Sequence, residues 1–212
     1  MTDPFPPGFF ERQDESPDPE FYGPPRLVTH IDVRAIEAVG LLYEELGIDG
    51  SGAPGGHVLD LMSSWISHFR TPPAELTVLG LNAAELEAND AATARVVQDL
   101  NLDPVLPFAD ATFTGATCCV SVDYLTRPID VFGEVARVLR PGAPFVVTFS
   151  NRCFPTKAIR GWLANDDLTH CRIVATYFLR SGAFGEVRQA RRTPPGPGDP
   201  LYAVWAATPA AG

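Results

Sequence analysis

Residues 57–65 combine a buried strand, a carboxylate and two hydroxyls, the side chains from which a ligand site can be built. His57-Val58-Leu59-Asp60-Leu61 predicts an apolar strand, and Met62-Ser63-Ser64-Trp65 predicts a sharp turn after it. An apolar strand that ends on a carboxylate and turns sharply is typical of the start of nucleotide-binding α/β proteins. Such turns usually hold glycines, because a backbone without Cβ can approach the ligand closely. This turn has none, so the rest of the chain must decide what the strand supports.

The four cysteines do not form a metal-binding or redox pattern. Cys118, Cys119, Cys153 and Cys171 contain no CxxC pair, and adjacent cysteines on a strand point to opposite faces. His170 precedes Cys171 on a predicted helix, where sequential neighbours do not face each other. We therefore expect reduced packing residues, no metal site and no Cys–His catalytic pair.

Length, charge and hydropathy narrow the class of protein. A chain of 212 residues suits one α/β domain with an appended segment. Its net charge of −10 disfavours binding to a nucleic-acid backbone, so small molecules or proteins are the expected partners. No window reaches the ~18 consecutive apolar residues of a membrane span. The first 20 residues contain no secretory signal, so we expect a cytoplasmic location.

Residues 1–25 form a separate N-terminal arm, and residues 26–212 are expected to form the domain. Up to residue 20 the arm contains prolines and carboxylates but a single arginine, a composition typical of a disordered segment. Phe5, Phe9 and Phe10 allow an alternative, in which the arm packs onto the body of the protein or onto a second subunit of a homodimer.

The spacing after the arm predicts a helix that precedes the sheet. Thr29 and Asp32 resemble a helix cap with its reciprocal acid. The apolar residues recur at intervals of three and four, and Gly47 ends the helix. These apolar residues are Ile36, Val39, Tyr43 and Leu46.

Strand and helix patterns then alternate and predict a doubly wound α/β sheet. Apolar runs predict strands at about residues 58–61, 76–81, 95–98, 116–122 and 145–149, after a Gly/Pro loop at 50–56. Helices are predicted at 83–89, 128–139, 156–163 and 168–179. The last two strands, near 184–191 and 201–207, flank a Pro/Gly connection and are expected to pair antiparallel.

Three phrases in the second half carry a resemblance to a known family. In order, they are Leu106-Pro107-Phe108-Ala109-Asp110-Ala111-Thr112-Phe113, Ser121-Val122-Asp123-Tyr124-Leu125 and Val135-Ala136-Arg137-Val138-Leu139-Arg140-Pro141-Gly142. Together with the order of elements, they make residues 26–208 resemble a class I S-adenosylmethionine-dependent methyltransferase of the small-molecule type. The resemblance implies a Rossmann-like sheet with strand order 3-2-1-4-5-7-6, strand 7 antiparallel, and an N-terminal helix.

The resemblance also implies roles for individual residues at the carboxyl ends of the strands. Asp60 would lie near the methionine part of the cofactor S-adenosylmethionine, and Asn82 at the ribose hydroxyls. Asp99 would lie near the adenine amino group with Leu100 beside the ring, and Ser121, Val122 and Asp123 would face the sulfonium.

Two departures from the family pattern concern cofactor binding. Met62, Ser63, Ser64 and Trp65 replace the family's glycine-rich turn, so the two serines would offer hydroxyl and backbone N–H groups to the cofactor carboxylate. Asn82 stands where the family usually has Asp or Glu. The loss of that negative charge would weaken ribose binding by roughly 1–2 kcal/mol.

The resemblance places His30, Asp123 and Asn151 where a methyl acceptor would be positioned or deprotonated, with His68 and Tyr124 nearby. His30 and His68 have a structural alternative as a surface and a turn histidine, and Asp123 has one as a solvated carboxylate. Tyr22, Arg26 and Trp162 are candidates for a substrate lid, and Arg26 is a candidate partner for a substrate carboxylate. The alternatives are an ion pair with an acid of the chain for Arg26 and packing for Trp162.

Two functions therefore remain open from the sequence. The first is methyl transfer from S-adenosylmethionine to a small molecule. The second is a non-catalytic relative that binds cofactor weakly or not at all and acts through protein interaction. A dinucleotide-dependent oxidoreductase is disfavoured, because the chain lacks a GxGxxG turn and has Asn82 at the ribose position.

Overall fold

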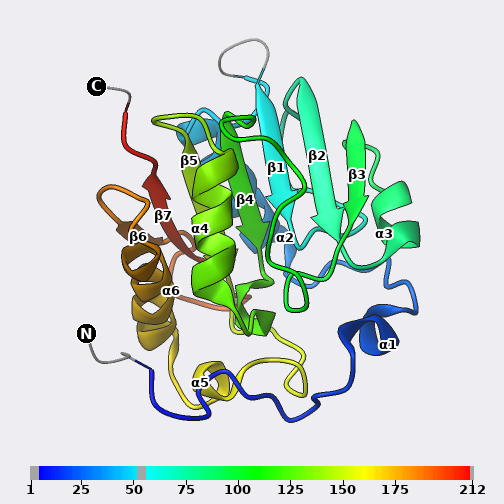
Figure 1. Ribbon diagram of the computed structural model, residues 1–212, viewed down its shortest axis with the longest axis vertical. Coiled ribbons are helices and arrows are strands. Elements are labelled where there is room, and N and C mark those ends of the chain that lie inside the picture. The colour runs from blue at the N-terminus through cyan, green and yellow to red at the C-terminus, as the bar shows by residue number, and fades with distance from the viewer. Residues whose placement is uncertain (1–4, 52–55, 211–212) are drawn as a thin grey trace.

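The structure is a computed structural model that describes residues 5–51 and 56–210. Most of the predicted loop at 50–56, the first four residues of the arm and the last two residues of the domain lie outside the described residues. Within them, a single mixed sheet is covered by helices on both faces (Figure 1).

The sheet has seven strands in the order β3-β2-β1-β4-β5-β7-β6, as predicted. The strands are β1 (His57–Leu61), β2 (Glu75–Gly80), β3 (Ala94–Val97), β4 (Gly115–Cys119), β5 (Pro144–Phe149), β6 (Arg188–Arg191) and β7 (Tyr202–Ala207). Strands β1 to β5 are parallel, and β7 pairs antiparallel with β5 and with β6. The central strands are buried because both faces are covered, which explains their unbroken apolar runs.

The longer helices divide between the two faces of the sheet. The helices are α1 (Asp18–Tyr22), α2 (Val33–Glu45), α3 (Ala83–Glu87), α4 (Pro128–Val138), α5 (Arg160–Leu163) and α6 (Asp167–Ser181), with a 3₁₀ turn η1 (Val122–Tyr124). Helices α4 and α6 cover one face and α2 the opposite one, whereas α1 and α5 lie beyond the ends of the parallel strands (Figure 1). The largest apolar cluster lies under α4 and α6, and a second joins α2 to β5 and β7. Cys118 and Cys119 belong to opposite faces, as expected.

Helix α2 begins at a different cap from the one predicted. Asp32 is the N-cap, and its side chain accepts a hydrogen bond from Ala35 N at 2.9 Å. The prediction that Thr29 caps the helix is wrong. Asp32 also exchanges hydrogen bonds with Asp199, since each backbone N–H donates to the other's carboxylate. This contact with the loop before β7 fixes the helix start at a position that local sequence did not reveal.

The connection from β1 to β2 contains no helix, although the predicted alternation of strand and helix favours one. Residues 62–74 instead form an extended loop that lies against α2. A Cβ placed on Gly40 of α2 would lie 3.1 Å from His68 O. Phe69 packs against Tyr43, with ring centres 4.8 Å apart, and joins the clusters on this face. The apolar cover that a crossover helix would give is thus supplied by one aromatic side chain and its loop.

The N-terminal arm is packed from residue 5 onward, so the expectation of a disordered arm is wrong there. Phe9 is buried in the largest apolar cluster, and Phe5 and Phe10 contact Tyr177 of α6. Gly161 N donates to Phe9 O at 2.8 Å, and α5 therefore holds the arm by its backbone as well. The arm runs along the edge of the sheet at which the parallel strands end (Figure 1).

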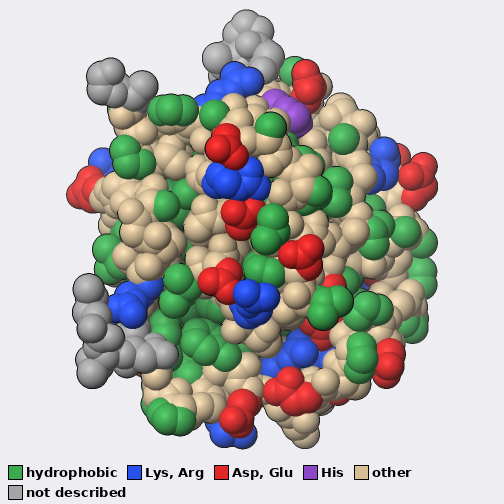
Figure 2. Space-filling view, viewed as in Figure 1, with side chains coloured by type: hydrophobic (Ala, Val, Ile, Leu, Met, Phe, Trp, Pro, Cys, Tyr) green, Lys and Arg blue, Asp and Glu red, His purple; other side chains and the backbone are tan. Residues whose placement is uncertain are grey.

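The exposed face of α4 carries paired charges. Figure 2 shows acidic and arginine side chains alternating down this helix, and the pairs include Arg127–Asp130 and Arg137–Glu134. The face shown therefore offers no basic patch for a phosphate backbone. No helix in the described part of the chain is both long and apolar enough to cross a membrane.

Candidate functional site

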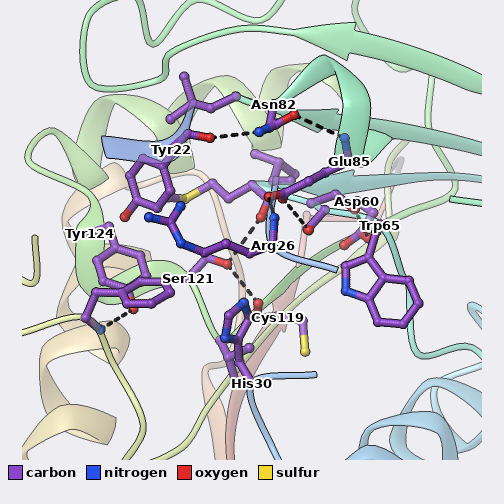
Figure 3. Close-up of a pocket in the computed structure, with 18 of the residues that line it drawn as sticks. Tyr22, Arg26, His30, Asp60, Trp65, Asn82, Glu85, Cys119, Ser121 and Tyr124 are labelled. Carbon is purple, nitrogen blue, oxygen red and sulfur yellow. Dashed lines mark hydrogen bonds between the residues drawn. The ribbon is translucent and has the colours of Figure 1, made fainter. Parts of the chain in front are cut away.

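A cavity of about 550 Å³ lies at the carboxyl ends of β1 to β5 (Figure 3). Ligands of open α/β sheets bind at this edge, and cavities of ~300–1,000 Å³ suit small molecules. Its wall includes all eight residues predicted from the sequence to bind cofactor: Asp60, Met62, Ser63, Ser64, Asn82, Asp99, Leu100 and Ser121. Segments 40 residues and more apart in the chain thus meet at one surface.

Asp60 ends the buried part of β1 and is only 4% exposed. Its carboxylate accepts hydrogen bonds from the hydroxyls of Thr117, Ser63 and Ser67 at 2.6–2.7 Å. Burial raises the pKa of Asp60, and these hydroxyl donors oppose the rise. Most of the hydrogen-bonding capacity of Asp60 is therefore used within the protein.

The turn after β1 achieves its close packing with a glycine in the neighbouring strand. Ser63 N donates to Leu79 O at 2.8 Å, so the turn continues along the end of β2. A Cβ on Gly80 would overlap the carbonyl oxygen of Ser63. The close backbone approach for which a glycine-rich turn is used thus depends here on Gly80 in β2.

The two serines of the turn point toward protein partners. Ser63 Oγ donates to Asp60, and Ser64 Oγ donates to Glu85 Oε2 at 2.5 Å. Trp65 Nε1 donates to Val28 O at 3.0 Å, which ties the turn to the segment before α2. Each hydroxyl keeps lone pairs for a ligand donor, but its own proton is committed.

Backbone strain is concentrated where β1 and β4 end. Met62 and Val120 both have positive φ angles, of 52° and 47°, and both line the cavity. Val120 is β-branched, so this conformation is unfavourable and costs on the order of 1–3 kcal/mol. Ser121 Oγ donates to Met62 O at 3.2 Å and to Cys119 O at 2.8 Å, linking the two strained turns. Strain of this kind clusters at functional sites. The strained angle of Val120 also explains why β4 ends at Cys119, three residues earlier than predicted.

Asn82 is the N-cap of α3, and its amide is fully used. Its side-chain oxygen accepts from Ala84 N and Glu85 N. Its side-chain nitrogen donates to the backbone oxygens of Tyr22 and Gly23 at 2.8 and 2.9 Å. An Asp could not make the last two bonds, because a carboxylate has no proton to donate. Asparagine at this position thus binds the arm to the sheet.

Asp99 and Leu100 lie in the cavity wall beyond β3. Asp99 Oδ1 accepts from the backbone N–H groups of Asn101 and Leu102. The amide of Asn101 donates to Asp18 and to Tyr124 O, so this loop also contacts the arm. Sequence reasoning missed Asn101, and its role depends on contacts with residues 83 and 23 positions away.

The three predicted catalytic residues do not lie together. His30 and Asn151 line the cavity, whereas Asp123 does not and is 2% exposed in η1. Burial raises the pKa of Asp123 to about 8. Burial lowers the pKa of His30, whose ring lies 5.3 Å from that of Phe154. Of the predicted lid residues, Tyr22 and Arg26 line the cavity, but Trp162 is buried and stacks on His170.

Several cavity residues carry no sequence signal. Glu85 accepts from Arg26 N at 2.6 Å and from Ser64, and it therefore connects the arm, the turn and α3. Ser67 reaches the cavity from a loop without a recognisable pattern, and Val120 reaches it from the end of the segment predicted as a strand at 116–122. No group of His, Cys, Asp and Glu side chains within residues 5–51 and 56–210 is arranged to hold a metal ion.

Comparisons with known proteins agree with this geometry. The family model of a methyltransferase domain matches residues 52–147. No curated protein sequence matches the chain. Among solved structures, the 4+2 cyclase SpnF is similar, with a TM-score of 0.60 and 14% identity over 91% of this chain and 92% of that one.

Two further similar structures are methyltransferases by name. The first is an S-adenosylmethionine-dependent methyltransferase from Aquifex aeolicus, with a TM-score of 0.58 and 14% identity over 84% of this chain and 94% of that one. The other is phosphoethanolamine N-methyltransferase 2 of Haemonchus contortus, solved with S-adenosyl-L-methionine. Its TM-score is 0.53, with 11% identity over 82% of this chain and 56% of that one.

Proposed function

We propose that this chain, whose residues 52–147 match the family model of a methyltransferase domain, is a class I S-adenosylmethionine-dependent methyltransferase that methylates a small molecule. S-adenosylmethionine is the cofactor of that domain. The observation that carries the proposal is the cavity at the ends of β1 to β5, which joins the eight predicted cofactor residues in one wall. We further propose a cytoplasmic protein, and its net charge of −10 disfavours nucleic-acid substrates.

The cavity fits the cofactor best at its adenosine end. Leu81 and Leu100 offer apolar contact for an adenine ring, and Asp99 and Gln98 offer acceptors beside it. At the other end, the Asp60 carboxylate and the turn after β1 would hold the methionine part. Asn82 has no spare hydrogen-bonding atom, so we expect the ribose to be held without its help.

Methyl transfer requires little acid–base catalysis from the protein. The cofactor supplies a methyl group already activated on a sulfonium, and the protein contributes orientation and exclusion of water. The strained turns at Met62 and Val120, which Ser121 links by hydrogen bonds, form part of the wall for this purpose. His30 is the better candidate to accept a proton from an acceptor, since its lowered pKa keeps the ring neutral near pH 7.

A non-catalytic role is the second candidate, and the saturated side chains of Asn82 and Asp60 favour it. Folds of this kind also serve other chemistry, as the name of the 4+2 cyclase SpnF indicates. Calorimetric titration with S-adenosylmethionine and S-adenosylhomocysteine, with NAD as the control, separates the candidates. We expect both sulfur ligands to bind and NAD not to bind. Absence of heat and of thermal stabilisation at millimolar ligand would exclude the methyltransferase.

A matched pair of variants tests the role of Asp60. We expect Asp60→Asn to weaken binding of S-adenosylhomocysteine about tenfold, since the carboxylate would lose its charge toward the ligand ammonium group. Asp130→Asn, on the exposed face of α4, should leave affinity unchanged. Equal affinities for both variants, with equal melting temperatures, would show that Asp60 only supports the turn.

A further inference from the structure

Hydrogen-bonding groups in the cavity wall are unevenly satisfied. Every carboxylate there has protein donors: Asp18, Asp60, Glu85 and Asp99 each accept at least two hydrogen bonds. By contrast, Arg26 Nη1 and Tyr22 Oη are buried and have no partner among the residues that the structure describes. Buried polar atoms are nearly always paired, so these two donors, like His68 Nδ1 in the same wall, require an explanation.

Arg26 is held in place without an ionic partner. Its backbone N–H donates to Glu85, and its Nη2 donates to Phe21 O at 2.8 Å. No carboxylate within the described ranges lies at ion-pair distance from its guanidinium, although the chain carries a net charge of −10. An arginine fixed by its backbone and one nitrogen presents the other nitrogen in a preset direction.

Aromatic rings surround the two donors. The Arg26 Cζ lies 4.7 Å from the ring centre of Phe21 and 5.4 Å from that of Phe154. Tyr22 lies edge-on to Tyr124, with ring centres 6.2 Å apart. Figure 3 shows Arg26 crossing the cavity between Tyr22 and Tyr124, on the side away from Trp65. The surroundings thus combine one fixed positive charge, a second donor and apolar walls.

We propose that Arg26 Nη1 and Tyr22 Oη bind the carboxylate of an aromatic acid, which is the second ligand of the cavity. A carboxylate has two oxygens, one for each donor, and one negative charge to pair with the guanidinium. The flanking rings of Phe21, Tyr22, Tyr124 and Phe154 suit an aromatic body. This inference rests on the proposed function, in which the second ligand is the methyl acceptor.

Paired acids and amides test the charge requirement directly. Benzoate and cinnamate are titrated into the full chain at pH 7, with and without S-adenosylhomocysteine, and compared with benzamide and cinnamamide. We expect each acid to bind at least about tenfold more tightly than its amide, since the amide keeps the shape but not the charge. Equal binding of acid and amide, or no binding of either acid, overturns the inference.

Three variants assign the effect to the two donors. Tyr22→Phe removes only the hydroxyl and should reduce benzoate affinity at least about fivefold. Arg26→Gln removes the charge and should reduce benzoate affinity at least as much and also abolish the preference over benzamide. Arg188→Gln, at an exposed pair with Glu186, is the control and should change neither. Melting temperatures establish that each variant is folded.

The outcomes separate this inference from the proposed function. If S-adenosylhomocysteine binds but the acids show no preference over the amides, only the inference fails. If the variants weaken S-adenosylhomocysteine and not benzoate, the donors serve the cofactor carboxylate, and the inference also fails. If the acids keep their preference while S-adenosylhomocysteine does not bind, the acid site stands and the methyltransferase proposal fails.

Discussion

Asp123 shows how one buried side chain makes stability depend on pH. Its Oδ2 has no hydrogen-bond partner among the described residues, and burial raises the pKa to about 8 from its ordinary value of 3.8. The folded protein therefore keeps a proton there that the unfolded chain has lost above pH 4. The neutral carboxyl stabilises the fold at low pH, and this contribution is lost as the pH rises toward 8.

His68 has the opposite effect on stability at lower pH, so the effect of Asp123 is best measured above pH 6.5. Burial lowers its pKa from 6.5 to about 4, so its contribution to stability is lost as the pH falls from 6.5 toward 4. Between pH 6.5 and 8, we expect the unfolding free energy to fall with rising pH by up to about 1.4 kcal/mol per pH unit. Asp123→Asn should flatten this slope in urea titrations, whereas Asp130→Asn should keep it. An unchanged slope in Asp123→Asn would assign the titration to another group.

At the scale of elements, the loop of residues 62–74 takes the place of a helix between β1 and β2. Its packing depends on glycines in its neighbours rather than in the loop itself. Gly80 admits the carbonyl of Ser63, and Gly40 admits the side chain of Arg70 and the backbone of His68. A glycine-free turn is therefore compatible with a close crossing, because the missing Cβ is on the other side of the contact.

A pair of glycine substitutions tests whether the close crossing of the turn and β2 depends on Gly80. Gly80→Ala should destabilise the fold by about 1–3 kcal/mol, because its Cβ would overlap backbone that cannot rotate away. Gly133→Ala in α4 has open space around the new methyl group and should stabilise by about 0.5–1 kcal/mol. Urea midpoints at constant slope measure both changes. Equal effects of the two substitutions would mean that the crossing is loose.

The elements that the sequence predicted are those with a strong local pattern. The central strands and the α4 helix follow from unbroken apolar runs and from the spacing of Phe132, Val135 and their neighbours, whereas the strand order was implied by the family resemblance. The loop at 62–74 was not predictable, because Phe69 packs on Tyr43 of a helix that precedes it by 20 residues and more. The early end of β4 was missed for a related reason, since Val120 holds a strained angle that propensity opposes.

The site was predictable in part, for the same physical reason. The predicted cofactor residues lie at or just after the carboxyl ends of parallel strands. Because these ends share one edge of the sheet, the residues line one cavity. What each side chain does there depends on distant partners. Asn82 binds Tyr22 O and Gly23 O, about 60 residues earlier, so its cap and its tie to the arm were not visible in the sequence.

At the scale of the whole molecule, the arm joins the N-terminus to the second half of the chain across the cavity edge. The composition of the arm predicted disorder, but carboxylates of the arm pair with a buried lysine, Lys157. Lys157 Nζ is fully buried, donates to Ser16 O at 2.6 Å, and lies 3.3 Å from carboxylate oxygens of Asp14 and Asp18. Arg12 pairs with Asp18 at 2.6 Å. This ionic cluster is beside α1, whose last residue, Tyr22, lines the cavity.

Because Lys157 holds several residues of the arm, one substitution at Lys157 should detach the arm from the domain. Lys157→Met keeps much of the side-chain volume but removes the buried cation from Ser16 O, Asp14 and Asp18, of which Asp18 keeps Arg12; the loss should cost about 3 kcal/mol. Hydrogen exchange in residues 9–22 should then rise at least about a hundredfold, while the amides of β1 and β4 change much less. Arg188→Ala breaks an exposed pair and should change exchange in neither region. If the arm and the central strands exchanged faster by the same factor, the arm would be part of the global unfolding unit rather than a strap over the cavity.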